Sequence, residues 1–350
     1  MSKIVLISCS SKKLNRRAKA EDLYISPLFQ KSLRYAKCLK PDKIFVLSAK
    51  HHLLHLSKVI SPYNLTLNDM YTDEIKKWSD IVLQQLRKVS DLNKDNFIFI
   101  AGSTYLEYII PQIKYYEIPM ENMRIGEQLE GLTDELKICD ECALLHQLFK
   151  TLPKFSLPFK KVSIPNNGIY ILFEKGEVAH GTNRIVRVGT HTGLNQLHSR
   201  LIEHFLTKNK DRSIFRKNIG RAILNKRRDP FIIQWEKDLT SKKAREEHAK
   251  SIDFKKQNRI EKIVSRFIQS YFSFVVFPIA DEEERLDLES KIISTVSLCN
   301  ECQPSDNWLG LHSTVNNIRK SGLWLKRGLW KTPLSKTDIK MLKHVVNRSL

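Results

Sequence analysis

The chain has no hydrophobic run of the roughly 20 residues that a membrane-spanning helix needs. It also lacks an internal repeat and a low-complexity tract, and residues 1–10 lack the hydrophobic core and cleavage site of a signal peptide. These absences argue against membrane-embedded, repetitive and secreted classes of protein. We therefore expect a folded cytoplasmic protein of bacterial or viral type that has no membrane partner.

Cysteine is scarce, with six residues in a chain of 350, so a disulfide framework is not expected. Cys139 and Cys142, and likewise Cys299 and Cys302, have the Cys-x-x-Cys spacing found in zinc sites. However, 156 residues separate the two pairs, whereas a small zinc module usually brings its pairs closer together in sequence. The spacing favours reduced cysteines on a helix face and in a loop, with zinc binding as the alternative.

Acidic residues are too few to balance the basic ones, and the deficit is local. Residues 1–150 contain 22 Lys and Arg against 18 Asp and Glu, whereas residues 151–350 contain 37 against 20, a net charge of +17. A positive field of this size attracts polyanions and weakens as salt is added. The second part of the chain is therefore expected to bind nucleic acid.

The length predicts two domains, and the first has an α/β pattern. Residues 3–9, 43–49 and 97–102 are short apolar runs typical of buried parallel strands, with helical periodicity between them. We expect a three-layer α/β domain with a mostly parallel sheet, which binds ligands beyond the carboxyl ends of its strands. The candidate pocket residues at or near this edge are Cys9, Ser10, Lys12, Tyr24, Ser48, Lys50, His51, Tyr63, Gly102 and Tyr105. Small residues after strands also form ordinary tight turns, so a purely structural role stays open.

Five segments carry a resemblance over residues 3 to about 132. They are Ser8–Ser10, Leu23–Phe29, Leu47–His51, Ile60–Leu65 and Ala101–Tyr105. In this order they resemble an uncharacterised bacterial domain family, distantly related to the peroxide-stress YaaA proteins and to domains found near DNA base-modification enzymes. The resemblance implies a nucleobase-related or DNA-contacting role, without an agreed reaction.

Prolines at positions 153, 158 and 165 prevent a continuous helix across residues 151–167. We predict a domain at 1–150, a packed linker at 151–165 and a second domain at 166–350. In the second domain, residues 168–173 and 184–189 are expected to be strands joined by a turn through 174–177. A helix should follow, with Arg200 and His204 on a strip adjacent to its core face. The residues expected on that core face are Leu194, Leu197, Leu201 and Phe205.

The second domain resembles the GIY-YIG endonuclease superfamily over residues 166 to about 330. Tyr170 matches the tyrosine of the first motif, Val188-Gly189 the end of the second, Arg200 the helix arginine and Glu289 the metal-binding glutamate. The resemblance implies an α+β domain with a small antiparallel sheet flanked by helices. Arg187 stands where the second motif has a tyrosine. Any role of that tyrosine's hydroxyl must therefore be absent from this chain or be performed by another group.

These residue types suit phosphodiester hydrolysis. One carboxylate, that of Glu289, suffices to hold a hydrated Mg²⁺ or Mn²⁺ ion, and the Arg200 guanidinium can bind the scissile phosphate through two donors. The resemblance implies that Tyr170 is the general base, a role for which an ordinary phenol needs a nearby cation. His204 is a candidate for proton transfer or phosphate binding, and Asn307 for orienting water or substrate. Each residue taken alone also has an ordinary structural interpretation.

Basic residues near this site form a predicted track for the DNA backbone. The candidate substrate-binding residues are Arg187, Lys208, Lys210, Arg212, Arg216, Lys217, Arg227 and Arg228.

Three functions remain open at this point. The preferred one is a restriction-like or phage-defence endonuclease whose first domain recognises target DNA, for example a modified base. The second is a bifunctional enzyme whose first domain is a DNA glycosylase or base-processing site. The third is a catalytically inactive DNA-binding regulator. The sequence does not exclude RNA as the substrate, and one active site per chain makes homodimerisation plausible if both strands are cut.

Overall fold

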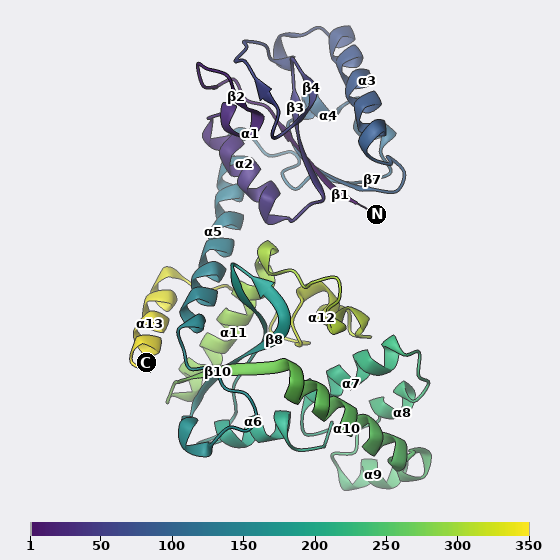
Figure 1. Ribbon diagram of the computed structural model, residues 1–350, viewed down its shortest axis with the longest axis vertical. Coiled ribbons are helices and arrows are strands. Elements are labelled where there is room, and N and C mark those ends of the chain that lie inside the picture. The colour runs from purple at the N-terminus through teal and green to yellow at the C-terminus, as the bar shows by residue number, and fades with distance from the viewer. Residues whose placement is uncertain (1, 350) are drawn as a thin grey trace. The chain divides into compact units, whose positions relative to one another are not determined.

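The computed structural model describes residues 2–349, which divide into two compact units (Figure 1). The first unit extends to Lys137 and the second begins at Ile138, so the division falls within helix α5 (Ile125–Lys150). The predicted linker at 151–165 belongs to the second unit. There Phe155 exchanges backbone hydrogen bonds with Phe274 of strand β10 (Phe272–Pro278), and Ile164 is buried in the core.

The first unit contains a five-stranded sheet in the order β4-β3-β1-β6-β7, in which β4 spans His52–His55 and β7 spans Tyr115–Glu117. Strand β1 (Lys3–Ser8) lies in the middle and pairs in parallel with β3 (Lys43–Ser48) and β6 (Asn96–Ile100). Strand β7 also pairs in parallel, whereas β4 is antiparallel to β3. The predicted mostly parallel sheet is therefore confirmed, and its three buried strands lie where the apolar runs indicated.

Helices of the first unit follow the local sequence signals. Helix α2 (Pro27–Cys38) begins with proline at its first position, and the Ser26 hydroxyl accepts a hydrogen bond from the Phe29 N–H at 3.2 Å. Helix α3 (Thr72–Val89) packs its apolar face, including Trp78 and Val82, against the sheet. These contacts fix the edge of the sheet that carries the candidate pocket residues.

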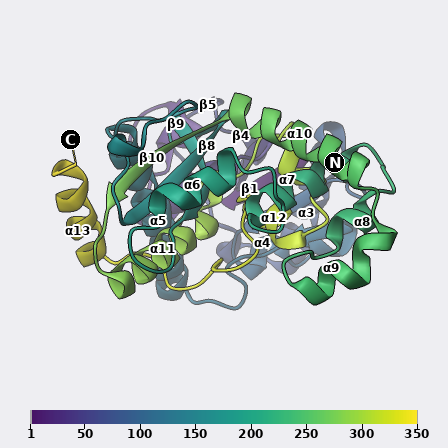
Figure 2. The same ribbon diagram turned by 90° about the horizontal axis from the view of Figure 1, so that it is seen from below.

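The second unit is built around a three-stranded antiparallel sheet in the order β10-β8-β9, which confirms the expected α+β architecture. Strand β8 (Gly168–Ala179) is central and pairs with β9 (Thr182–Gly189). Helices α6, α7 and α10 supply core residues such as Leu201, Ile219 and Val264. In both views, α7 to α10 group together at one end of this unit (Figures 1 and 2).

The prediction of a turn at 174–177 is wrong, because strand β8 continues through these residues. Its pairing with β9 is irregular after Leu172. The chain reverses instead at His180-Gly181, where both residues have positive φ, 50° and 70°. Glu174 is buried because the indole N–H groups of Trp308 and Trp324 both donate to it, at 2.8 and 2.9 Å. The two tryptophans that stabilise Glu174 in the interior are thus more than 130 residues away from it in the chain.

The predicted helix also begins later than expected. Helix α6 spans Leu197–Phe205, and Leu194 precedes it with 72% of its surface exposed, so its predicted core position is wrong. Leu197, Leu201 and Phe205 are buried as predicted. Among residues 2–349, no helix combines the length and apolar character needed to cross a membrane.

The remaining elements of the first unit are β2 (Ala18–Lys19), α1 (Ala20–Leu23), β5 (Val59–Ile60), η1 (Leu67–Asp69), α4 (Ser103–Leu106) and η2 (Ile110–Gln112). Those of the second are η3 (Lys161–Ser163), α7 (Ile214–Lys226), α8 (Ile232–Glu236), α9 (Lys242–His248), η4 (Ala249–Ser251), α10 (Phe254–Tyr271), α11 (Glu282–Leu298), η5 (Asn300–Cys302), η6 (Leu309–His312), α12 (Asn316–Ser321) and α13 (Lys336–Asn347).

Candidate active site

A cavity of about 520 Å³ opens where the end of β9 meets α6 and α11. Arg200 and Glu203 of α6 and Glu289 of α11 line it, together with Thr190, His191, Thr192, Gln196, Ser199 and Leu286. The fold thus brings Arg200 and Glu289 to one cavity although 89 residues separate them in the chain.

Glu289 is held by the backbone that follows the second strand. The Thr190 N–H donates to Glu289 Oε1 at 3.1 Å, and the Thr190 hydroxyl donates to the Gly168 carbonyl at 2.8 Å. Burial raises the pKa of the Glu289 carboxyl above its usual value, while the charges of Arg187 and Arg200 oppose that shift. A partly desolvated carboxylate next to guanidinium groups can bind a divalent cation to which a phosphate oxygen of the substrate also binds.

Tyr170 and His204 form a buried pair. The Tyr170 hydroxyl lies 2.7 Å from Nε2 of His204, and Nδ1 of His204 lies 2.7 Å from the Ser213 hydroxyl. Ser213 caps α7 by accepting the Arg216 N–H. Burial lowers the pKa of His204 well below its usual value, and the charges of Arg187, Arg200 and Arg216 lower it further. The imidazole is therefore neutral at pH 7.

Gly189 allows this pair to form. A Cβ atom at Gly189 would lie 2.2 Å from the Tyr170 hydroxyl, which is closer than real Cβ atoms approach other heavy atoms. Tyr170 and Gly189 are cross-strand partners in β8 and β9, so the glycine leaves the space that the phenol ring fills. Tyr170 and His204 are almost fully buried and stand apart from the residues that line the cavity.

Arg187 is also buried, and it lines a second cavity of about 350 Å³ with Asn218, Trp324, Lys326 and Arg327 among its neighbours. Its Nη1 donates to the Trp324 carbonyl at 2.6 Å, and its guanidinium lies over the Phe215 ring. Arg187 Nε and Asn218 Nδ2 have no hydrogen-bond partner among the described residues. These two donor atoms are buried, whereas Lys326 and Arg327 supply cations at the cavity that are suited to binding an anion.

Asn307 lies in an exposed turn just before the buried Trp308 and is not among the residues that line either cavity. The structure therefore does not bring Asn307 together with Arg200 and Glu289.

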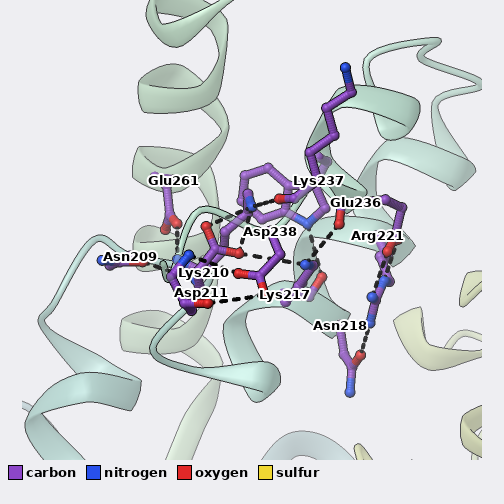
Figure 3. A network of polar contacts seen from close by, with 12 residues as sticks. Asn209, Lys210, Asp211, Lys217, Asn218, Arg221, Glu236, Lys237, Asp238 and Glu261 are labelled. Carbon is purple, nitrogen blue, oxygen red and sulfur yellow. Dashed lines mark hydrogen bonds and ion pairs between the residues drawn. The ribbon is translucent and has the colours of Figure 1, made fainter. Parts of the chain in front are cut away.

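The predicted basic track divides into buried and exposed residues. Arg216 pairs with Glu261 at 2.7 Å, and Lys210 pairs with Asp211, also at 2.7 Å. Lys217 is buried and donates to the Glu236 carbonyl at 2.9 Å (Figure 3). Lys210, Arg216 and Lys217 are therefore buried with partners inside the domain rather than exposed at its surface. The exposed members are Lys208, Arg212, Arg227 and Arg228.

The candidate pocket of the first unit is connected by hydrogen bonds between its own side chains. The Tyr63 hydroxyl lies 2.8 Å from that of Tyr24 and 2.7 Å from that of Ser48. The Cys9 thiol lies 3.3 Å from the Tyr105 hydroxyl. Side chains at or just after the ends of three different strands therefore lie close together. Burial also raises the pKa of the Tyr24 hydroxyl to about 12.

The other pocket candidates surround this group less closely. Lys50 Nζ lies 5.9 Å from the centre of the Tyr63 ring, and the His51 N–H donates to the Ser48 hydroxyl at 3.0 Å. Ser10 is partly exposed and Lys12 is exposed, and the Ser10 hydroxyl donates to the Lys12 carbonyl. Gly102 instead borders a cavity of about 640 Å³ lined by residues between 101 and 128, which the sequence did not indicate.

Two family models match the chain. The model described as GIY-YIG domain matches residues 143–349. The chain belongs to the GIY-YIG family. Its second unit is accordingly a nuclease domain, a phosphodiester hydrolase whose substrate is nucleic acid. Residues 4–134 match a family of unknown function, DUF6884. No curated protein and no solved structure matches the chain.

GIY-YIG nucleases generally use a divalent metal ion, and the cavity lined by Arg200 and Glu289 suits one. Hard cations such as Mg²⁺ prefer carboxylate and hydroxyl oxygens and keep several waters. Glu289 supplies one fixed carboxylate at this cavity, whereas Glu203 accepts a hydrogen bond from Arg200. A single carboxylate that lines an open cavity suits a hydrated divalent cation, which takes its other ligands from water and substrate.

Sequence reasoning missed three members of the GIY-YIG site. Thr190 fixes Glu289 through its backbone, which no side-chain pattern reveals. Glu203 lies one turn after Arg200 and accepts from its Nη1 at 2.8 Å, an i, i+3 spacing that could have indicated it. Ser213 precedes a helical segment as an N-cap residue does, but its bond to His204 needs the three-dimensional fold.

Proposed function

We propose that this GIY-YIG protein is a metal-dependent DNA endonuclease whose first unit recognises the target. The observation that carries the proposal is the cavity shared by Arg200 and Glu289, which places a guanidinium and a carboxylate against one substrate-sized space. A divalent cation held by Glu289 would neutralise charge on the scissile phosphate. Arg200 would hold a second phosphate oxygen through its planar donors.

Tyr170 is the candidate general base, and its partner supports that role. Ser213 accepts the Arg216 N–H, so its own proton is free to be donated to Nδ1 of His204. The imidazole proton would then be on Nε2, directed at the Tyr170 oxygen. In this arrangement the Nε2–H group would donate to the Tyr170 oxygen and position the ring, so that His204 acts through Tyr170 rather than on the phosphate.

Arg187 would complete the binding surface for a neighbouring phosphate. It replaces the tyrosine of the second motif, and Lys326 and Arg327 line the same cavity. The exposed Lys208, Arg212, Arg227 and Arg228 would extend the contact along the backbone. DNA rather than RNA is the proposed substrate.

The first unit would supply specificity. Its tyrosine hydroxyls bond to one another and to Ser48, which favours a rigid reader over a reactive centre. Recognition of a modified base combined with strand cleavage would make the protein restriction-like, with a role in defence against phage. Cutting both strands would require two chains or two visits.

The test is a cleavage assay on plain and base-modified phage DNA, with Mg²⁺, Mn²⁺ or neither ion, scoring strand breaks and released bases. We expect strand breaks that require the ion, no released bases, and a preference for one DNA type. Glu289→Gln should abolish cleavage while DNA binding persists. Glu283→Gln, an exposed glutamate on the same helix, is the matched control and should cut normally.

Intact DNA under all these conditions, with no difference between wild type and Glu289→Gln, would refute the proposed activity and favour a binding regulator. Released bases would instead assign a glycosylase reaction to the first unit.

A further inference from the structure

The two Cys-x-x-Cys pairs, separated by 156 residues in sequence, come together in the second unit. Cys142 lies on α5, and Cys302 ends η5 just after α11. Their sulfur atoms are 3.3 Å apart and buried, and the two cysteines do not form a disulfide. The fold therefore overrides the sequence spacing, which favoured separate reduced cysteines.

Two further ligand atoms complete a four-membered set. His180 Nε2 lies 3.4 Å from the sulfur of Cys302 and 3.4 Å from that of Cys299. Cys299 is in hydrogen-bonding contact with both Cys142 and Cys302, and His180 Nε2 lies within 4.8 Å of the Cys142 sulfur. Every pair among the four ligand atoms is thus in proximity.

These separations match a tetrahedral zinc site. Zinc–sulfur bonds of about 2.3 Å and zinc–nitrogen bonds of about 2.0 Å place sulfur atoms about 3.8 Å apart, and sulfur and nitrogen about 3.5 Å apart. The observed distances of 3.3 and 3.4 Å are within about half an ångström of these values. Three thiolates and one imidazole form a closed donor set of the kind found in structural zinc sites.

The surroundings of His180 give independent support. Its other ring nitrogen, Nδ1, lies 3.0 Å from a carboxylate oxygen of Glu301, which fixes the tautomer that leaves Nε2 free to bind a metal. His180 also occupies the first position of the two-residue β8–β9 turn with φ of 50°, where asparagine, aspartate or glycine is favoured.

The nearby His146 and Cys139 stand outside the set. His146 accepts the Ile185 N–H on Nε2 at 3.1 Å, and its Nδ1 lies 2.9 Å from the Cys142 carbonyl, so backbone groups use both ring nitrogens. Cys139 contacts the set through Cys299. We propose that Cys142, Cys299, Cys302 and His180 bind one structural zinc ion that joins α5, the β8–β9 turn and the end of α11.

This proposal is independent of the proposed nuclease mechanism, because its ligands are not part of the cavity at Arg200 and Glu289. Binding would convert the three thiols to thiolates and release their protons to solvent. Elemental analysis of the full chain, purified without chelators and dialysed, should find one zinc per chain. Glu289→Gln should retain it, which separates this metal from the catalytic cation.

Variants test the ligand set. Cys302→Ser should lose the zinc, and His180→Asn, which keeps a residue suited to the turn, should bind it at least about tenfold more weakly while remaining folded. Cys9→Ser, in the first unit, is the control and should retain one zinc. Cobalt-substituted protein should show the visible and charge-transfer absorption of a tetrahedral site with three thiolates.

Protein that contains no zinc and does not take it up when zinc is supplied would overturn the proposal, as would full zinc content in Cys302→Ser. Loss of zinc in Cys139→Ser with full retention in His180→Asn would overturn the ligand set in favour of four cysteines.

Discussion

The hydroxyl of Tyr170 lies 2.7 Å from Nε2 of His204, and the two side chains are almost completely buried. Neither residue has a charged partner in this contact, and the imidazole is kept neutral by burial and by the charges of three arginines. A neutral hydrogen-bonded pair in such surroundings is suited to accept or pass on a proton with little rearrangement.

Tyr170→Phe removes only the hydroxyl from this pair. We expect the cleavage rate to fall by about 100-fold or more, with DNA affinity nearly unchanged. Loss of the partner for His204 Nε2 should also lower the free energy of unfolding by about 1–3 kcal/mol. Single-turnover cleavage and a binding titration measure the two effects separately. Tyr271→Phe, an exposed tyrosine at the end of α10, is the control. Normal cleavage by Tyr170→Phe would exclude Tyr170 as the base.

Gly189→Ala tests the same contact from the opposite strand. The added methyl group would collide with the Tyr170 hydroxyl, so the phenol must move away from His204. We expect a loss of cleavage comparable to that of Tyr170→Phe and a destabilisation of about 1–3 kcal/mol, measured by chemical unfolding. The control is Gly126→Ala, since a Cβ there meets no atom within 4 Å. Unimpaired cleavage would mean that the ring position is not critical.

Exposed and buried arginines should behave differently. Arg227→Ala and Arg228→Ala are each expected to weaken DNA binding and to reduce the salt dependence of the affinity, by about 0.9 in the log–log slope per lost phosphate contact, without altering stability. Arg216→Ala should instead destabilise the second unit by about 3–5 kcal/mol, because it leaves Glu261 buried without its cation. Binding isotherms at several salt concentrations, together with thermal unfolding, distinguish the cases. Equal effects of all three on the slope would contradict this division.

Glu174 should make stability depend on pH. Burial raises the pKa of this carboxyl to about 7, against the hydrogen bonds from Trp324 and Trp308. Between about pH 4.5 and 7 the folded state holds a proton that the unfolded state has lost, so the free energy of unfolding falls as pH rises. Glu174→Gln removes this term, and its stability relative to wild type should increase by about 3 kcal/mol from pH 4 to 8. Unfolding at a series of pH values measures the difference, and a constant difference would contradict the assignment.

Local patterns were sufficient where a segment's environment is set by its own sequence. The three apolar runs of the first unit are parallel strands because continuous apolar stretches must be buried on both faces. Leu197, Leu201 and Phe205 are buried because helical spacing places them on one face. Arg200 and Glu289 share a cavity, as expected if the family motifs assemble one site.

Distant partners account for what the sequence did not reveal. Glu174 was expected in a turn because it is charged, and only Trp308 and Trp324 make its burial favourable. Lys210 and Arg216 were expected at the surface for the same reason, yet Asp211 and Glu261 pair with them in the interior. Such pairings depend on which segments meet in space, and the composition of a single segment does not contain that information.

The buried ion pairs near α7 also change how the charge of this domain acts. Arg216 pairs with Glu261, and Lys210 pairs with Asp211, where these side chains are almost inaccessible to solvent. Among residues 151–350, which contain 37 basic and 20 acidic groups, more basic than acidic residues are buried. The positive field that an approaching polyanion meets therefore comes from fewer surface cations than the composition indicates, so the salt dependence of the first encounter should be shallower than the net charge alone implies.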